Sequence, residues 1–278
     1  MQDVLVVVGT GGMGEAIARR SGAGQQVLLA DFDEAALERV GTALTGDGFA
    51  VTTQQVDVTF RDSVAALAAA AAELGPVRRV VHTAGLSPQQ APTAAVLKVD
   101  LYGVAVGLEE FGKVIAPGGA GVVIASMAGA LAVGRFPAEL EGALISTPTE
   151  ELLSLPFLQE GALPDSGAAY SIAKRANQLR VHAAATDWGA RGARINSISP
   201  GVISTPMGQH ELAGESGAGM RTMIEASGTG RIGTPSDIAG AAAFLLGPDA
   251  TFITGTDLLV DGGVVAAVRT GGIQLPGA

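Results

Sequence analysis

The sequence predicts an α/β protein built on a doubly wound parallel sheet of about seven strands. Three observations support this fold class. Short runs rich in Val, Ile and Leu alternate along the chain with longer helix-forming stretches. These runs are apolar almost throughout, which is typical of strands covered by helices on both faces. A glycine-rich turn also joins the first run to the first helix-forming stretch.

The expected elements follow one another in a regular order. The strands are expected at residues 3–8, 26–31, 50–58, 77–83, 121–126, 193–199 and 257–260, the last being the shortest. The intervening helices are expected at residues 15–21, 34–44, 61–74, 93–115, 168–188 and 235–246. No repeat or low-complexity linker divides residues 1–278, so we expect a single domain with a C-terminal tail at 264–278.

Residues 130–165 interrupt this rhythm. They are rich in Pro, Glu and Leu and stand between an expected strand and an expected helix, where a short loop would suffice. We expect a helical insertion there, placed before the helix at 168–188. Its apolar stretch at 152–158 needs to be covered by the same domain or by a partner. A surface excursion without function is the alternative.

Composition excludes several classes of function. The net charge is −10 and no stretch is rich in Lys or Arg, which argues against nucleic-acid binding. With no cysteine and three scattered histidines, we expect no metal site. No apolar run approaches the roughly 20 residues that span a bilayer, and no basic leader precedes the first strand. We expect a soluble cytoplasmic protein with no membrane partner.

The glycine-rich turn has the Gly-x-Gly-x-x-Gly spacing of a dinucleotide-binding loop, in a Rossmann-type fold. The turn comprises Gly9, Gly11, Gly12, Met13 and Gly14. Such glycines let the backbone approach a pyrophosphate at a helix N-terminus. A simple glycine-rich turn is the alternative, in a chain with 40 glycines.

A carboxylate follows the glycine turn at the distance expected for binding an adenosine ribose. Asp31 closes the second strand, 17 residues after Gly14. A carboxylate there would repel a 2′-phosphate, so we expect NAD rather than NADP as the cofactor. Arg19 and Arg20 lie nearby and could weaken this preference, although a solvated helix face explains them as well.

Tyr170 and Lys174 stand four residues apart on an expected helix and therefore share one face. Interconversion of an alcohol and a ketone by hydride transfer needs a proton donor or acceptor at the oxygen. A free phenol has a pKa of about 10, which is too high for a base at neutral pH. An adjacent ammonium would favour the phenolate, so this pair is suited to acid–base chemistry.

Together the motifs resemble those of the short-chain dehydrogenase/reductases, in that family's order, over residues 4–263. The resemblance implies that Ser126 hydrogen-bonds the substrate oxygen, that Tyr170 is the acid–base group, and that Lys174 also holds the nicotinamide ribose. Further cofactor contacts are implied by the same likeness. They are Asp57 and Val58 beside the adenine, Ala84 and Gly85 near the adenosine ribose, and Pro200, Gly201, Ile203 and Thr205 around the carboxamide.

Three departures from the family pattern stand out. The glycine turn is one residue shorter, and Thr83 replaces an asparagine. Asp100 occupies the position of a catalytic asparagine that shapes a helix kink and holds a water for proton relay. We expect Asp100 to support catalysis from behind the reacting groups and its charge to perturb Lys174; a merely structural role is the alternative. Tyr102 is expected to serve packing.

A looser resemblance links the chain to a 3α-hydroxysteroid dehydrogenase/carbonyl reductase subgroup with a comparable insertion. There the insertion occupies the surface that most relatives use for dimer contacts. We therefore expect a homodimer or homotetramer whose interface is altered by residues 130–165. The glycine-rich segment 207–220 is expected to form a mobile loop over the substrate.

The sequence thus predicts an NAD-dependent oxidoreductase that interconverts a secondary alcohol and a ketone. The Leu and Phe residues of the insertion suggest a hydrophobic small-molecule substrate, such as a steroid or terpenoid. Two alternatives remain open. One is a non-catalytic NAD-binding sensor or scaffold, and the other is an enzyme that retains NAD for epimerisation or dehydration.

Overall fold

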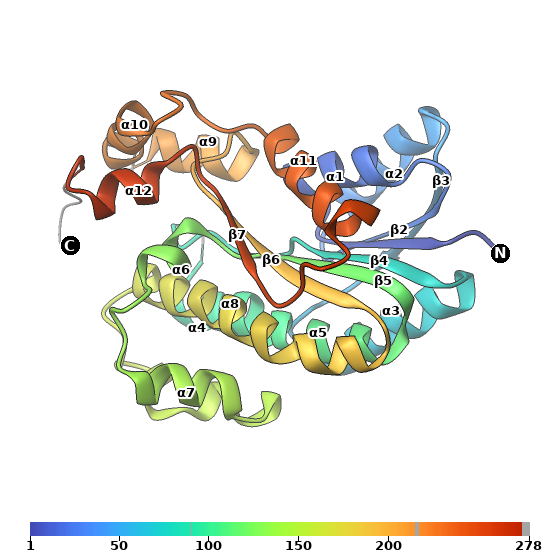
Figure 1. Ribbon diagram of the computed structural model, residues 1–278, viewed down its shortest axis with the longest axis horizontal. Helices are drawn as coiled ribbons and strands as arrows, with labels where there is room; N and C mark the ends of the chain where they lie inside the picture. Colours follow the sequence, from blue (N-terminus) through green and yellow to red (C-terminus); the bar gives the residue numbers. More distant parts are fainter. Residues whose placement is uncertain (90, 215–216, 274–278) are drawn as a thin grey trace.

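The computed structural model describes residues 1–89, 91–214 and 217–273, which form one seven-stranded parallel sheet (Figure 1). Its strands are β1 (Val4–Val8), β2 (Gln26–Asp31), β3 (Ala50–Gln55), β4 (Val77–His82), β5 (Ile115–Ile124), β6 (Arg194–Pro200) and β7 (Asp257–Val260). The strand order is β3-β2-β1-β4-β5-β6-β7. This confirms the predicted doubly wound fold. The order reverses between β1 and β4, where ligands bind in such sheets.

Helices cover both faces of the sheet because β1 sends alternate side chains to opposite sides. Leu5 and Val7 pack into a core beneath α1 (Gly12–Ser21), α2 (Glu34–Gly46) and α11 (Pro235–Leu246). Val4, Val6 and Val8 pack into a core beneath α3 (Arg61–Leu74), α5 (Val104–Val114) and α8 (Ser166–Ala190). The two helical layers lie above and below the sheet in Figure 1.

The single helix expected at 93–115 is wrong in detail. The structure divides this stretch into α4 (Thr93–Val96), the π-helical η1 (Leu97–Gly103) and α5, and residue 115 already belongs to β5. A π-helical turn accommodates one extra residue per turn and often occurs at functional sites. Here it contains Asp100, whose carboxylate is fully buried.

The insertion is helical, as predicted, and is docked on the outside of the α4 and α8 layer (Figure 1). It contains α7 (Ala138–Ser146), η2 (Thr149–Ser154) and η3 (Pro156–Leu158). Its buried side chains Leu144, Leu152 and Leu158 pack with residues of α4, η1 and α8 in a third core. The apolar stretch at 152–158 is therefore covered by the chain's own helices.

The segment expected to be a loop at 207–220 instead forms helices. These are α9 (Pro206–Ala213) and the start of α10 (Gly217–Ala226), while residues 215 and 216 lie outside the described part. The remaining elements are α6 (Met127–Leu131), η4 (Pro248–Ala250) and α12 (Val264–Arg269). Of the expected tail, residues 274–278 are not described.

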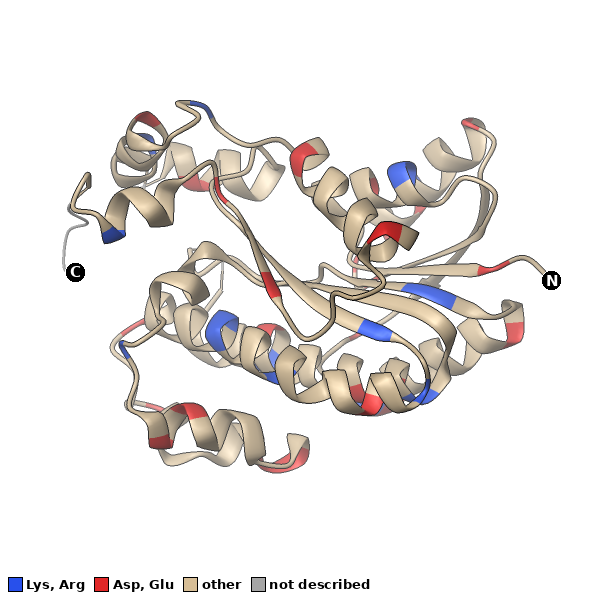
Figure 2. Ribbon diagram, viewed as in Figure 1, with Lys and Arg blue, Asp and Glu red and all other residues tan. Residues whose placement is uncertain are grey.

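Charged side chains are spread over many elements. Figure 2 shows Lys and Arg dispersed over both helical layers rather than gathered on one element. Within the described residues, every helix is too short or too polar to cross a membrane.

Because the insertion packs on the third core, we expect its buried side chains to contribute to the free energy of unfolding. Leu152→Ala should lower the free energy of unfolding by about 2–5 kcal/mol, because it opens a cavity in the third core. Ile145→Ala is the control, since Ile145 is 40% exposed, and it should change stability by less than about 1 kcal/mol. Urea denaturation measures both. Equal losses for the two variants would contradict the docked arrangement.

Candidate active site

A cavity of about 550 Å³ lies at the carboxyl ends of the strands, beside the switch point between β1 and β4. Eleven of the predicted cofactor residues line it: Gly9, Gly11, Gly12, Met13, Gly14, Asp31, Asp57, Val58, Ala84, Gly85 and Thr205. The sequence reasoning did not select the other lining residues, which are Phe32, Val56, Thr59, Thr83, Leu86, Val99, Pro206 and Met207.

The glycine turn is tight enough to require glycine at two positions. Gly9 has a φ of +97°, a conformation that side chains with a Cβ rarely adopt. A Cβ on Gly14 would lie 1.9 Å from the carbonyl oxygen of Gly9. The turn places the N-terminus of α1 at the cavity, where backbone N–H groups and the helix dipole favour an anion.

Asp31 is held at the cavity by a residue that the sequence reasoning missed. The backbone N–H and the hydroxyl of Thr10 donate to Asp31 Oδ2 at 2.6 and 2.9 Å. The N–H of Asp33 donates to the other oxygen at 3.0 Å. A threonine between glycines gives no sequence signal for this role, because its partner lies 21 residues away.

The nearby cation Arg19 pairs with other carboxylates. It contacts Glu15 at 3.0 Å and also Asp47, the C-cap residue of α2. Among the described residues that line the cavity there is no Lys or Arg. The expected solvated helix face is therefore the better explanation of Arg19.

Tyr170 and Lys174 lie side by side on α8, with Lys174 Nζ 5.4 Å from the centre of the Tyr170 ring. Lys174 Nζ also donates to the Ile124 carbonyl at 3.3 Å. Gly85 lines the cavity and also lies beside this ammonium, since a Cβ on Gly85 would be 3.3 Å from Lys174 Nζ. The glycine turn and the Tyr170–Lys174 pair thus belong to one region.

Asp100 forms a buried ion pair with Lys174, with Oδ2 and Nζ 3.1 Å apart. The N–H of Leu86 donates to the other oxygen at 2.7 Å. Burial lowers the pKa of Lys174, but the attraction of Asp100 outweighs this and the net pKa is raised. The ammonium therefore stays charged. Burial, together with the Lys174 charge, lowers the pKa of the buried His82 to about 3.

The electrostatics of Tyr170 are less favourable to the phenolate than the sequence suggested. Burial raises its pKa above the usual value, and the charges of Asp100 and Glu211 add to this. Lys174 and a hydrogen bond with Ser126 act in the opposite direction, as expected, without reversing the net rise. In the free protein Tyr170 is therefore a neutral phenol at neutral pH.

Ser126 caps α6, directly after β5. Its Oγ accepts a hydrogen bond from the N–H of Ala128 at 3.2 Å. A capping hydroxyl uses only its acceptor side, so its proton is still available for a neighbouring oxygen.

Glu211 on α9 was also missed by sequence reasoning. It accepts a hydrogen bond from the buried Ser87 hydroxyl, which ties α9 to the segment after β4. Thr205 caps the same helix by accepting from the N–H of Gly208 at 3.1 Å. The structure thereby places a carboxylate close enough to Tyr170 to affect its pKa.

The segment after β6 is divided between two sites. Thr205 lines the large cavity, whereas Gly201 and Ile203 line a separate cavity of about 210 Å³. Pro200 is the last residue of β6 and is buried. The structure therefore does not bring these three predicted residues into the lining of the large cavity.

Comparisons with known proteins agree with this arrangement. The family model for enoyl-(acyl carrier protein) reductase matches residues 7–138 and 151–265. The short-chain dehydrogenase/reductase bsc3 of Alternaria brassicicola is 43% identical, over 95% of this chain and 96% of that protein. The 3-alpha-hydroxysteroid dehydrogenase/carbonyl reductase of Comamonas testosteroni is 32% identical, over 68% of this chain and 73% of that protein.

A solved structure supports the same assignment. A variant of actinorhodin polyketide ketoreductase with NADPH is similar with a TM-score of 0.74 and 25% identity, over 95% of this chain and 97% of that one. The sheet order, the glycine turn at the switch point and these matches together lead to one conclusion. The chain belongs to the short-chain dehydrogenase/reductase family, whose members oxidise alcohols or reduce carbonyls with a nicotinamide dinucleotide.

Proposed function

We propose that this protein is an NAD-dependent enzyme that interconverts a secondary alcohol and a ketone on a hydrophobic small molecule. The observation that carries the proposal is the shared region formed by the cavity, Gly85 and the Tyr170–Lys174 pair. Ser126 lies close enough to Tyr170 to hydrogen-bond it.

The residues of the cavity fit a nicotinamide dinucleotide. The glycine turn and the α1 N-terminus would bind its pyrophosphate, Asp31 the adenosine ribose, and Asp57 and Val58 the adenine. Lys174 would hold the nicotinamide ribose and the Thr205 segment the carboxamide. When bound, this group would supply the hydride acceptor or donor.

The chain's own residues would manage the proton at the substrate oxygen. Ser126 would donate a hydrogen bond to that oxygen, while the Tyr170 phenol gives up its proton in reduction and takes one in oxidation. The charged Lys174 would stabilise the resulting phenolate. Asp100 would act behind these groups by keeping Lys174 protonated and in place.

Asp31 supports the preference for NAD. Its carboxylate is fixed by Thr10 at a cavity whose described lining residues include no Lys or Arg. A 2′-phosphate would meet this negative charge without a compensating cation. The similar ketoreductase structure contains NADPH, so the preference needs a direct test.

Apolar side chains in the lining of the large cavity support a hydrophobic substrate. Leu86, Val99, Pro206 and Met207 contribute apolar surface to the cavity. The insertion does not supply this surface in the way the sequence suggested, because Leu144, Leu152 and Leu158 are buried in the third core. The name of the Comamonas testosteroni relative is consistent with a steroid-like substrate.

Tyr170→Phe should lower kcat by at least about 100-fold, because the variant keeps the ring and loses the proton donor. NADH affinity, measured by fluorescence titration, should be nearly unchanged. Turnover close to the wild-type rate would exclude Tyr170 as the acid–base group. Loss of NADH binding would instead indicate a role in the cofactor site.

Asp31→Asn should lower the preference for NADH over NADPH by about tenfold or more, equivalent to about 1.4 kcal/mol, because it removes the negative charge and keeps an acceptor for Thr10. Dissociation constants for both nucleotides measure this ratio. Glu38→Gln is the control, since it removes the same charge from an exposed position on α2. An unchanged ratio in Asp31→Asn would refute the assignment.

Glu211→Gln should move the rising limb of the pH profile of alcohol oxidation to lower pH, by up to about one unit. Oxidation requires the phenolate, so kcat/KM rises as pH passes through the pKa of Tyr170. Glu211 raises that pKa, and its neutralisation therefore lowers it. Glu225→Gln on α10 is the control. A limb that stays in place or moves to higher pH would contradict the assigned electrostatics.

A further inference from the structure

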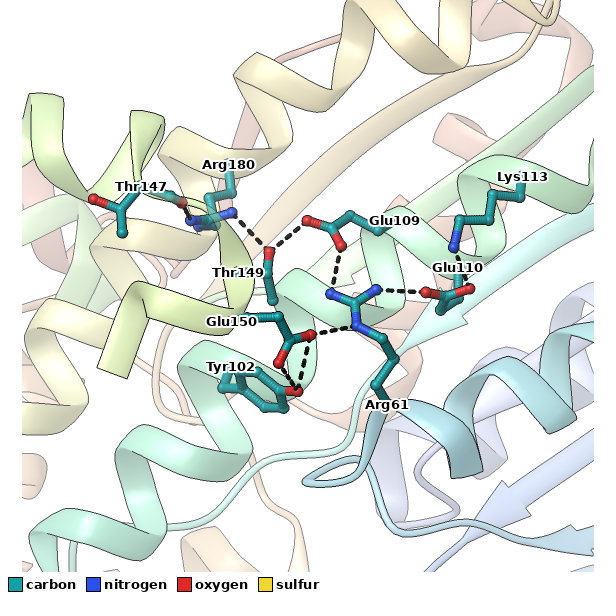
Figure 3. A network of polar contacts seen from close by, with 9 residues as sticks. All are labelled: Arg61, Tyr102, Glu109, Glu110, Lys113, Thr147, Thr149, Glu150 and Arg180. Atoms are coloured by element: carbon teal, nitrogen blue, oxygen red, sulfur yellow. Dashed lines mark hydrogen bonds and ion pairs between the residues drawn. The ribbon is translucent and has the colours of Figure 1, made fainter. Parts of the chain in front are cut away.

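A polar network fastens the insertion to the body of the protein around Arg61, the first residue of α3 (Figure 3). In the described part of the chain, its guanidinium contacts three carboxylates. Glu109 lies 2.6 Å away, and Glu110 and Glu150 are closer still. Glu109 and Glu110 belong to α5, whereas Glu150 belongs to η2 of the insertion. One side chain therefore links α3, α5 and the insertion.

The stretch 147–150 of the insertion has further anchors in this network. Arg180 on α8 donates to the Thr147 carbonyl at 2.6 Å and to the Thr149 hydroxyl at 3.3 Å. The Thr149 hydroxyl donates to Glu109. Tyr102 on η1 donates to Glu150 Oε2 at 3.1 Å. The expectation that Tyr102 serves packing alone is therefore incomplete.

The centre of the network, at Arg61 and Glu110, is partly shielded from solvent. The Arg61 side chain is 28% exposed and that of Glu110 is 7% exposed. Glu150 is more exposed, at 61%, and hydrogen bonds from Arg61 and Tyr102 lower its pKa further, so this carboxylate is ionised at neutral pH. Glu110 also pairs with Lys113 at 2.7 Å, which balances part of the negative charge.

The contact between Glu150 and Tyr102, called the Tyr102 arm, connects the insertion with the buried ion pair. Tyr102 lies two residues after Asp100 on the same π-helical turn. The next residue, Gly103, packs against Val58 so closely that a Cβ would lie 2.9 Å from Val58 Cγ2. A shift of this turn would therefore move both Asp100 and a wall of the cavity.

The contact between Glu150 and Arg61, called the Arg61 arm, connects the insertion with the part of the cavity lined by Thr59. Arg61 follows Thr59, a lining residue, by two positions. The N–H of Thr59 donates to Asp57 Oδ1 at 2.9 Å, so residues 57–61 form a short connected segment. Glu150 contacts both the Tyr102 arm and the Arg61 arm.

We propose that Glu150 is a positioning residue for the reaction, through which the insertion fixes both η1 with Asp100 and the segment 57–61 of the cofactor cavity. The role rests on the proposed function, because it acts on residues assigned to that reaction. Glu150 does not touch the reacting groups. It acts through Tyr102 and Arg61.

The test compares Glu150→Gln, Tyr102→Phe and Arg61→Lys with Glu151→Gln, an exposed neighbour, as the matched control. Tyr102→Phe cuts one arm and should lower kcat about threefold to tenfold, with a smaller loss of NADH affinity than Glu150→Gln causes. Glu150→Gln should lower kcat and also weaken NADH binding about threefold or more. Arg61→Lys should weaken NADH binding, because an ammonium cannot bind three carboxylates in the fork geometry of a guanidinium.

Amide hydrogen exchange of the protein without nucleotide gives a readout that does not require turnover. Glu150→Gln should speed exchange in residues 97–103, and Glu151→Gln should not. If the wild-type protein turned over no substrate, the proposed function would fail. The exchange measurement would still test whether Glu150 holds residues 97–103 in place. A lower melting temperature for Glu150→Gln, with wild-type kcat, NADH affinity and exchange in 97–103, would overturn the proposal and leave the network as a structural anchor.

Discussion

The buried ion pair between Asp100 and Lys174 is the constraint on which the site depends. Two charges taken out of water are stable only with close geometry and further hydrogen bonds. The 3.1 Å separation, the Leu86 N–H and the Ile124 carbonyl supply both. The pair joins the π-helical turn to α8, and a Cβ at position 85 would press against both partners, at 3.2 Å from Asp100 Oδ2 and 3.3 Å from Lys174 Nζ. The large cavity and the Tyr170–Lys174 pair are thereby brought together.

Much of the fold follows from patterns that the sequence carries locally. The apolar strands, the glycine turn and the four-residue spacing of Tyr170 and Lys174 depend on neighbours along the chain, so they predict the sheet and the shared face of α8. The helical insertion was also predictable, because its composition breaks an otherwise regular alternation. Local patterns gave six lining residues of the cavity, those of the glycine turn and Asp31, and the family resemblance gave five more.

The remainder depends on contacts between residues that are distant in sequence. The π-helical turn in the stretch 93–115 carries Asp100 to its contacts with Leu86 and Lys174, whereas helix-forming residues alone predict a continuous helix there. Arg61 and Glu150 are 89 residues apart, and Ser87 and Glu211 are 124 apart. The effect of Lys174 on the pKa of Tyr170 was predictable, but the net rise was not, since burial and the Glu211 charge are properties of the folded site.

The two hydrogen bonds from Thr10 to Asp31 limit how the proposed preference for NAD over NADP could be redesigned. Thr10 is fully buried, and both its amide and its hydroxyl are directed at that carboxylate. A small apolar replacement at position 31 would strand these two donors without acceptors, at a cost of about 1–3 kcal/mol each. Under the proposed role of Asp31, engineering acceptance of a phosphorylated ribose is therefore a two-position problem in this scaffold. A library that varies residues 10 and 31 together would reach stable solutions that single substitutions miss.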